Sequence, residues 1–360
     1  IVGLLLPYAS YITCSWDIYK SNHFSVYAPD SYSELAYESL YYLEKHRPSV
    51  IKATGSKNPK HMYMVLQDMG QQLNGYSMVH TNKISLFSPA PASPTALSFS
   101  RNWLETVAIH EQFHNHHLYH STFNTPLGLF STQLFMPLIF IEGLAVYMES
   151  QLHPYQGRLN DGLYTSILLT KAKEKKLPSL YHSAIFHNHF PLGQYYMYGG
   201  EFVNFLAKNS SSDFSKQLIS WYFMPPSPLD FKGFKHINDF SKYYFQSSIE
   251  TLHTQFYDDL TRKSQSWRLP ESTQLAHSHT MTQPIIANNN LYYIEHHVNF
   301  VGPYTVYSYY NLIEQHRTSL QKKILKTFYS EPIIDPIRFH NNTLYIAISS
   351  PKLGFNNIDN

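Results

Sequence analysis

The sequence feature that most constrains this chain is the pentapeptide from His110 to His114, which reads HEQFH. It has two histidines four residues apart and a glutamate directly after the first, which is the H-E-x-x-H pattern. On a helix, positions four apart lie on one face, so both imidazoles can reach a single metal ion. Glu111 then stands beside that metal as a base for a water molecule. The pattern predicts a helix that carries a hydrolytic metal site.

The metal helix is predicted to begin near Asn102, because Glu105 follows three residues later as in a capping box. A stripe at helical spacing is apolar at its start and imidazole at its end; it consists of Trp103, Val107, His110, His114 and His117. This order predicts a helix that enters the core and then opens onto a cleft. We expect His116, His117 and His120 to line the rim of that cleft.

A second helix is predicted to begin after Pro137 and to carry Glu142 in a long apolar surround. A carboxylate in such a setting is costly unless it is paired or binds a metal ion. Glu142 is therefore a candidate third metal ligand. Glu149 lies seven residues later on the same helix face and is a candidate to form a hydrogen bond with a metal ligand without binding the metal itself.

His120 is an alternative third ligand, because its spacing from the motif fits the longer pattern H-E-x-x-H-x-x-G-x-x-H. The glycine of that pattern lets the chain turn sharply, so that the last histidine can return to the metal. The glycine position is occupied here by His117, which disfavours the turn. Glu142 is the preferred ligand, and His120 remains the alternative.

HEQFH followed by FIEGLAVYMES resembles the gluzincin branch of zinc peptidases, especially the bacterial peptidase MA-like domains. The resemblance covers about residues 20 to 260. It implies one zinc ion, Zn2+, held by His110, His114 and Glu142. It also implies hydrolysis of a peptide bond by a zinc-activated water whose proton is accepted by Glu111.

Two further segments extend the resemblance to gluzincins. Tyr196-Met197-Tyr198-Gly199 resembles the Y-x-x-G segment that opens a later helix in gluzincin aminopeptidases, which implies that Tyr196 holds the transition-state oxyanion. Tyr198 is the second choice for this role. The segment from Asn74 to Pro89 resembles the edge strand along which such enzymes pair an extended substrate. The sequence lacks a G-x-M-E-N type segment that grips a substrate amino terminus, which argues against aminopeptidase activity.

Periodicity predicts the elements around these motifs. Strands are expected at 24–28 and 61–67, a hairpin or one long strand at 76–87, and helices at 163–173 and 201–208. An early helix is expected to start at a capping box of Ser31 and Glu34 and to end at Pro48. Pro89, Pro91 and Pro94 are expected to form a linker before the metal helix.

The expected fold class is an α+β zincin-like metallopeptidase domain with a C-terminal β-rich, propeller-like region that is incomplete. The four expected regions are 1–20, a signal-peptide remnant or strand; 21–100, an α+β lobe with the substrate edge strand; 101–268, a helical zinc-binding lobe; and 269–360, a β-rich repeat region, expected to be truncated. The repeat rests on PIIANNNLYYI (284–294) and PIRFHNNTLYI (336–346), which are offset by 52 to 53 residues. Two unrelated hairpins are the alternative.

Composition limits the partners of the chain. Its 27 basic and 25 acidic residues create no field that attracts nucleic acid, so we expect a peptide or protein substrate. A protein partner is also expected at the C-terminal β region. One cysteine, Cys14, excludes an internal disulfide. We expect no membrane-spanning helix. The apolar segment Ile1–Cys14 favours export to the periplasm, cell envelope or exterior. The alternative function is a catalytically silent zincin-like module that presents a β-propeller to a protein partner.

Overall fold

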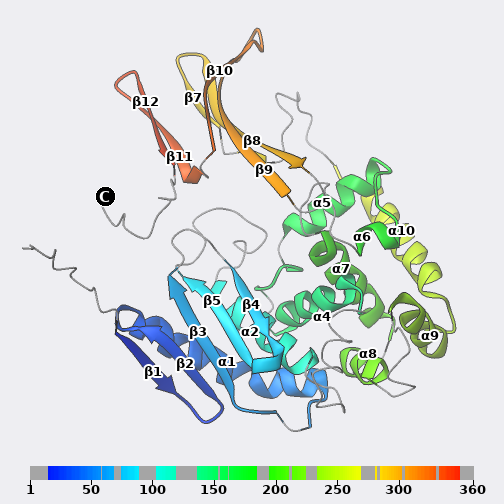
Figure 1. Cartoon of the computed structure of the whole chain (residues 1–360). Coiled ribbons are helices and arrows are strands. Elements are labelled where there is room, and N and C mark those ends of the chain that lie inside the picture. Colours follow the sequence, from blue (N-terminus) through cyan, green and yellow to red (C-terminus); the bar gives the residue numbers. More distant parts are fainter. Residues whose placement is uncertain are drawn as a thin grey trace, which may run out of the picture.

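The computed structural model describes residues 15–57, 59–68, 74–88, 103–118, 136–152, 155–160, 162–184, 194–210, 213–223, 233–268, 280–281, 284–301, 305–329 and 332–348. A five-stranded sheet comes first, a group of helices follows, and antiparallel sheets come last (Figure 1). This order confirms the mixed α+β class, the helical region and the β-rich C-terminal region. Four predicted features lie outside the described residues: the segment Ile1–Cys14, the three-proline linker, Asn102 and His120.

The first sheet has the strand order β1-β2-β3-β5-β4. Its strands are β1 (Trp16–Lys20), β2 (Phe24–Pro29), β3 (Met62–Asp68), β4 (Gly75–Met78) and β5 (Lys83–Ser88). The three central strands are parallel, and β1 and β4 are antiparallel strands at the two edges. Alternate side chains of the central strands, such as Val26, Met64 and Leu86, are buried in one core. The predicted strands and the hairpin therefore form, with β4 at one edge of the sheet among the described strands.

Helix α1 (Ser33–Thr54) packs on this sheet, but both of its predicted ends are wrong. A short 3-10 turn, η1 (Asp30–Tyr32), precedes it, and no side chain caps its first turn. Pro48 lies inside the helix. A proline there costs one backbone hydrogen bond, but the burial of Val50 and Thr54 beyond it stabilises the continued helix. The helix ends where Gly55 takes a φ of 69° and donates its N–H to the Ile51 carbonyl.

Helix α2 (Trp103–Leu118) lies between two hydrophobic cores. Val107 belongs to the core beneath the sheet, and Phe113 belongs to the core of the later helices. Every residue of α2 is buried, so the helix does not open onto a cleft rim as predicted. His116 and His117, which were expected at that rim, are 5% and 0% exposed. The rim prediction is wrong because neighbouring elements cover both faces of the helix.

Glu105 links α2 to α1. Its buried carboxylate accepts hydrogen bonds from Lys45 Nζ at 2.7 Å and His46 Nε2 at 2.6 Å, both on α1. Burial raises the pKa of Glu105, but the bonds to Lys45 and His46 outweigh this effect and lower it. The Glu105 carboxylate therefore forms a tertiary ion pair, and the predicted capping box with Asn102 lies partly outside the described residues.

Seven further helices are described beside the first sheet: α4 (Leu138–Gln151), α5 (Gly162–Lys173), α6 (Leu180–Ser183), α7 (Gln194–Lys208), α8 (Phe214–Phe223), α9 (Gly233–Phe245) and α10 (Ile249–Gln265). Pro137 directly precedes α4, as predicted. Helix α7 begins at Gln194 rather than at Glu201, so the YYMYGG segment lies within its first turns. No helix in the described part of the chain has the length and apolar character needed to cross a membrane.

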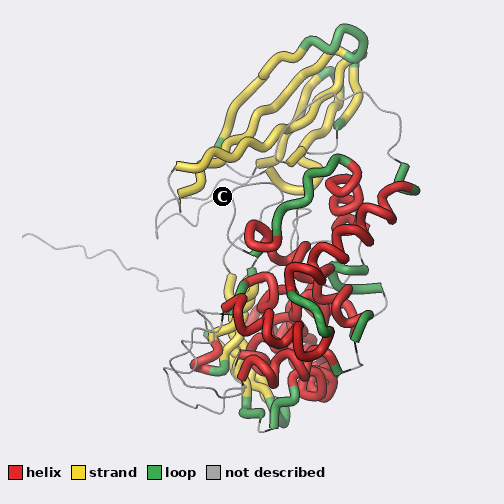
Figure 2. The backbone as a smooth tube through the Cα atoms, turned by 90° about the vertical axis from the view of Figure 1, so that its right-hand side faces the viewer, coloured by secondary structure: helices red, strands yellow, loops and turns green. Residues whose placement is uncertain are grey.

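The C-terminal strands form two antiparallel sheets (Figure 2). The first contains β6 (Thr280–Met281), β7 (Ile285–Ala287), β8 (Asn290–Val301), β9 (Thr305–His316) and β10 (Lys322–Phe328), and the second is the hairpin β11 (Pro332–His340) and β12 (Thr343–Ile348). Buried side chains of both sheets share one cluster, in which Ile337 of the hairpin joins Tyr292 and Leu312. The two sheets therefore pack against each other.

The two sequence repeats fold into matching hairpins. The β7–β8 turn consists of Asn288 and Asn289, with φ of 48° and 63°, and the β11–β12 turn consists of Asn341 and Asn342, with φ of 46° and 58°. Two successive residues with positive φ are typical of a type I′ hairpin turn, and asparagine tolerates this conformation. Asn288 Nδ2 donates to Asn342 Oδ1 at 2.7 Å, so the turns lie side by side. The described strands close no propeller, and the propeller stays a prediction.

Candidate metal centre

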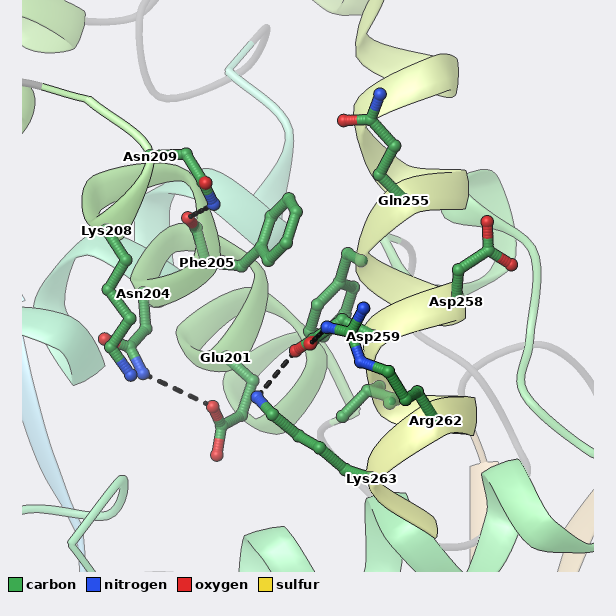
Figure 3. A pocket seen from close by; sticks show the side chains of 12 residues that line it. Glu201, Asn204, Phe205, Lys208, Asn209, Gln255, Asp258, Asp259, Arg262 and Lys263 are labelled. Carbon is green, nitrogen blue, oxygen red and sulfur yellow. Dashed lines mark hydrogen bonds and ion pairs between the residues drawn. The ribbon is translucent and has the colours of Figure 1, made fainter. Parts of the chain in front are cut away.

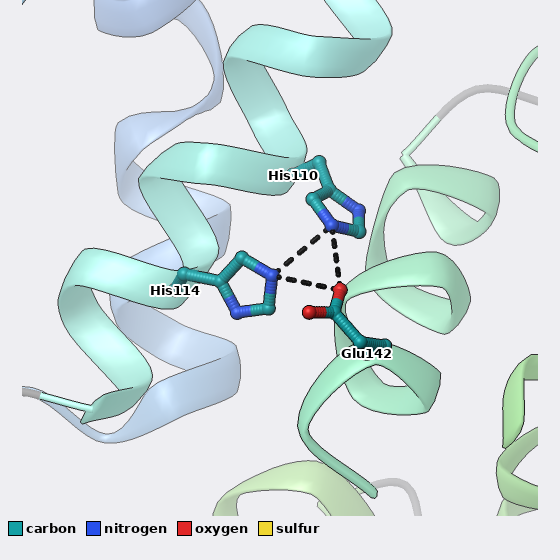
Figure 4. A group of neighbouring side chains, drawn as sticks. All are labelled: His110, His114 and Glu142. Carbon is teal, nitrogen blue, oxygen red and sulfur yellow. Dashed lines mark hydrogen bonds and ion pairs between the residues drawn. The ribbon is translucent and has the colours of Figure 1, made fainter. Parts of the chain in front are cut away.

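Three side chains converge on one point between α2 and α4 (Figure 4). His110 Nε2 lies 3.0 Å from His114 Nε2, and Glu142 Oε2 lies 3.2 Å from each of these nitrogens. Ligand atoms around a tetrahedral zinc ion with bonds of about 2.0–2.1 Å are separated by roughly 3.3 Å. The spacing of the three atoms therefore fits one shared metal ion.

The protonation of His110 supports this fit. Its Nδ1 lies 2.9 Å from Glu149 Oε2 on α4. A proton on Nδ1, donated to Glu149, leaves Nε2 with a lone pair that faces His114 and Glu142. Lone pairs of two imidazoles and a carboxylate at 3.0–3.2 Å repel one another unless a proton or a metal ion lies between them. The donor set can thus hold a metal ion.

The charges around His110 also favour a cation. Burial and Arg158 lower the pKa of His110, but hydrogen bonds to Glu142 and Glu149 raise it to about 9. Burial raises the pKa of Glu142, but the two histidines hold it well below its ordinary value. The pocket thus stabilises a positive charge, and a metal ion that binds there must displace a proton from His110 at neutral pH.

Glu111 lies beside these ligands on α2 and is held by the edge strand β4. Ser77 Oγ shares its one proton between the Glu111 carbonyl at 2.6 Å and Glu111 Oε2 at 2.9 Å, and Asn115 Nδ2 donates to the same hydroxyl at 3.1 Å. Strand β4 can approach α2 because of Gly75, where a Cβ atom would lie 2.5 Å from Val107 Cγ1. The strand that the resemblance assigns to substrate binding thus lies against the metal helix.

Helix α7 crosses α4 at two glycines, and this crossing brings Tyr196 to the site. A Cβ atom on Gly143 would lie 2.6 Å from the Gly199 carbonyl oxygen, and one on Gly199 would collide with the Ile139 carbonyl. Only glycine permits this approach of two backbones. Gly143 directly follows Glu142, and Gly199 ends the Y-x-x-G segment. One crossing therefore explains the glycines of both motifs.

The three tyrosines at the start of α7 have different surroundings. The ring of Tyr196 lies 6.0 Å from that of His110, and that of Tyr195 lies 4.6 Å from the ring of Tyr196. Burial is the largest cause that raises the pKa of Tyr196, and the charges of Glu142 and Glu111 also raise it. Tyr198 is 0% exposed in the helical core, and its hydroxyl has no hydrogen-bond partner among the described residues. The geometry favours Tyr196 over Tyr198 as the group that faces the metal ligands.

Arg158 and Ser77 are polar residues of the site that the sequence reasoning missed. Arg158 is buried and forms an ion pair with Glu149, the residue behind His110. The sequence holds one signal for Arg158, since it is the only lysine or arginine between residues 102 and 170. Ser77 has no such signal, because serine is common in strands and loops alike.

A cavity of about 510 Å³ lies between α7 and α10 (Figure 3). Its lining residues are Glu201, Asn204, Phe205, Lys208, Asn209, Gln255, Phe256, Asp258, Asp259, Leu260, Arg262 and Lys263. Burial raises the pKa of Glu201. None of these residues belongs to the metal cluster, so this cavity is not where the candidate ligands converge.

Comparison with known proteins gives limited matches. No model of a known protein family matches the sequence. A stretch of 81 residues is 40% identical to an uncharacterized protein of Treponema pallidum (strain Nichols), and the match covers 22% of this chain and 8% of that protein. The crystal structure of an aminopeptidase N family protein from Idiomarina loihiensis aligns with 94% of this chain and 69% of its own, with 11% identity and a TM-score of 0.44.

Proposed function

We propose that this chain is a zinc-dependent peptidase. The proposal is carried by the convergence of His110, His114 and Glu142 beside a second carboxylate, that of Glu111, which is not one of the converging ligands. Three protein ligands leave a metal ion one open position. A zinc ion bound there would polarise a substrate carbonyl and lower the pKa of a water to about 7.

The residues of the chain would then divide the work of hydrolysis. Glu111 accepts the proton of the attacking water and passes it to the leaving amine. Ser77 orients Glu111 through its hydrogen bond at 2.9 Å. Tyr196 donates its hydroxyl proton in a hydrogen bond to the developing oxyanion. The edge strand β4 pairs with the backbone of an extended peptide.

Zinc is proposed over iron because of Glu111. Two histidines and one carboxylate also bind non-haem Fe(II) in oxygenases. Hydrolysis additionally needs a carboxylate that lies near the metal as a base without occupying a coordination position. Glu111 meets this need through its place on α2 and its bond to Ser77.

Metal removal tests the proposed function. We expect the purified protein to contain about one zinc per chain by elemental analysis and to cleave an unstructured peptide. Dialysis against a chelator should abolish cleavage, and one equivalent of zinc should restore it. Iron instead of zinc would contradict the assignment. Protein that keeps its zinc and cleaves no peptide would favour the alternative of a catalytically silent binding module.

Tyr196→Phe is expected to lower kcat by about 10²–10³, because the loss of one oxyanion donor typically has this effect. Zinc content and folding should not change, since the hydroxyl is the only group removed. The measurement is kcat and KM on one peptide substrate, together with elemental analysis.

Tyr198→Phe is the matched control for this experiment. Its hydroxyl is buried in the helical core, so kcat should stay at the parental value. The opposite pattern, a slow Tyr198→Phe and a normal Tyr196→Phe, would transfer the donor role to Tyr198. Normal turnover in both variants would place the donor elsewhere.

We also infer that residues 269–360 belong to a propeller-like repeat array that binds a protein partner. Support comes from the two matching Asn-Asn hairpins and from the antiparallel order of β7 to β10, which is that of one propeller blade. The hairpin β11–β12 repeats β7–β8 and packs on the first sheet. Repeat units of this kind bury their apolar faces against their neighbours.

A further inference from the structure

Arg158 is the buried cation at the centre of the site. It is 4% exposed, and its guanidinium grips the Glu149 carboxylate with two bonds: Nε donates to Oε1 at 2.7 Å and Nη2 donates to Oε2 at 2.8 Å. A bidentate pair of this kind fixes both orientation and position. Burial lowers the pKa of Arg158, but Glu149 outweighs this effect and raises it, so the guanidinium stays charged.

The segment that carries Arg158 is folded back onto α4 by specific bonds. Gly157 adopts a φ of 84°, and a Cβ atom there would lie 2.5 Å from Ser150 Cα. The Arg158 backbone N–H donates to Glu149 Oε1 at 3.0 Å, and Leu159 N donates to Ser150 Oγ at 3.0 Å. Arg158 is thus held in one position by hydrogen bonds from its backbone as well as from its side chain.

Arg158 contacts two groups that act in the proposed reaction. Through Glu149 Oε2, which lies 2.9 Å from His110 Nδ1, it holds the ring plane of a metal ligand. Its own Nη2 lies 2.8 Å from the same nitrogen. On its other side, Arg158 Cζ lies 4.7 Å from the centre of the Tyr196 ring, within the range of a cation–π contact.

We propose that Arg158 is a positioning residue that sets the His110 imidazole, through Glu149, and the Tyr196 phenol in one fixed arrangement. A residue that only neutralised Glu149 would need no contact with Tyr196. The kinetic part of this proposal rests on the proposed peptidase function, whereas the part that concerns His110 does not.

Cobalt(II) binding tests the His110 part without any assay of activity. Arg158→Lys keeps the charge but loses the planar fork. We expect cobalt(II), titrated into metal-free protein and followed by its visible absorption, to bind about 10-fold more weakly, with shifted bands. Arg262→Lys is the matched control, because Arg262 is exposed on α10 and pairs with Asp259. It should bind cobalt as the parent does.

A double-mutant cycle tests the Tyr196 part. Arg158→Lys should lower kcat about 10-fold with KM unchanged, since Arg158 supports a transition-state donor and does not touch substrate. In the Tyr196→Phe background the same change should lower kcat less than about 2-fold, because the group that it positions has already lost its function.

The outcomes separate this proposal from the proposed function. The positioning role would be overturned if Arg158→Lys binds cobalt as the parent does and also lowers kcat by the same factor with and without Tyr196→Phe. If the parent binds cobalt but cleaves no peptide, the proposed peptidase function is wrong. The cobalt titration alone then tests whether Arg158 positions His110. If Arg158→Lys does not fold by circular dichroism, the pair Arg158→Gln with Glu149→Gln replaces it and is compared with Glu149→Gln alone, relative to which it should show the same expected losses.

Discussion

Glu111→Gln is expected to lower kcat by about 10²–10⁴ while zinc content stays at the level of the parent. The amide keeps the shape of the side chain but cannot accept a proton from water. The metal should remain, because the three converging ligand atoms come from His110, His114 and Glu142. The amide oxygen can still accept the Ser77 hydrogen bond, so the fold should not change. Peptide turnover and elemental analysis on the same preparation give both values.

Glu174→Gln is the matched control for this substitution. Glu174 is exposed and pairs with Lys176 on the surface, so the same chemical change should leave turnover unchanged. A Glu111→Gln variant with full turnover would exclude Glu111 as the base. Loss of zinc from the variant would instead indicate that Glu111 helps to hold the metal.

The convergence of the two histidines could be predicted because their arrangement is local. His110 and His114 are brought together by helical periodicity alone, and the structure places their Nε2 atoms 3.0 Å apart. Glu142 comes from another helix, but a single carboxylate in an apolar helix needs a partner. The structure supplies that partner, since Glu142 meets both histidines between α2 and α4. The sequence therefore predicted both the contact between Glu142 and the two histidines and its physical reason.

The supporting residues could not be predicted, because tertiary contacts bring them to the site. Ser77 reaches Glu111 only because the sheet order places β4 on the edge beside α2. Arg158 reaches His110 only because Gly157 turns the chain back over the end of α4. No local periodicity encodes either contact.

The errors at helix ends have the same cause. Pro48 usually ends a helix, but the continued burial of Val50 keeps α1 helical beyond it. Local signals give the preference of a segment, and tertiary packing decides the outcome.

The second prediction concerns the third ligand and separates Glu142 from His120. Glu142→Ala should weaken zinc binding by more than about 10²-fold, since loss of even an outer partner of a ligand weakens metal binding by 10–100-fold. Turnover should fall with the zinc. His120→Ala should keep both, because Glu142 Oε2 already completes a set of three ligand atoms within 3.0–3.2 Å of one another. Zinc content after dialysis against a graded chelator measures the difference.

Glu142→Gln refines this test, because it keeps the volume of the side chain and one oxygen while removing the charge. If charge is what holds the metal between two neutral imidazoles, Glu142→Gln should lose zinc almost as readily as Glu142→Ala. If zinc is lost only from His120→Ala, the ligand set is His110, His114 and His120, and Glu142 becomes a hydrogen-bond partner of the two histidines. The low pKa of Glu142 would then reflect its bonds to His110 and His114 alone. Retention of zinc by Glu142→Ala and its loss from His120→Ala cannot both occur if the three atoms that converge in the structure are the ligands.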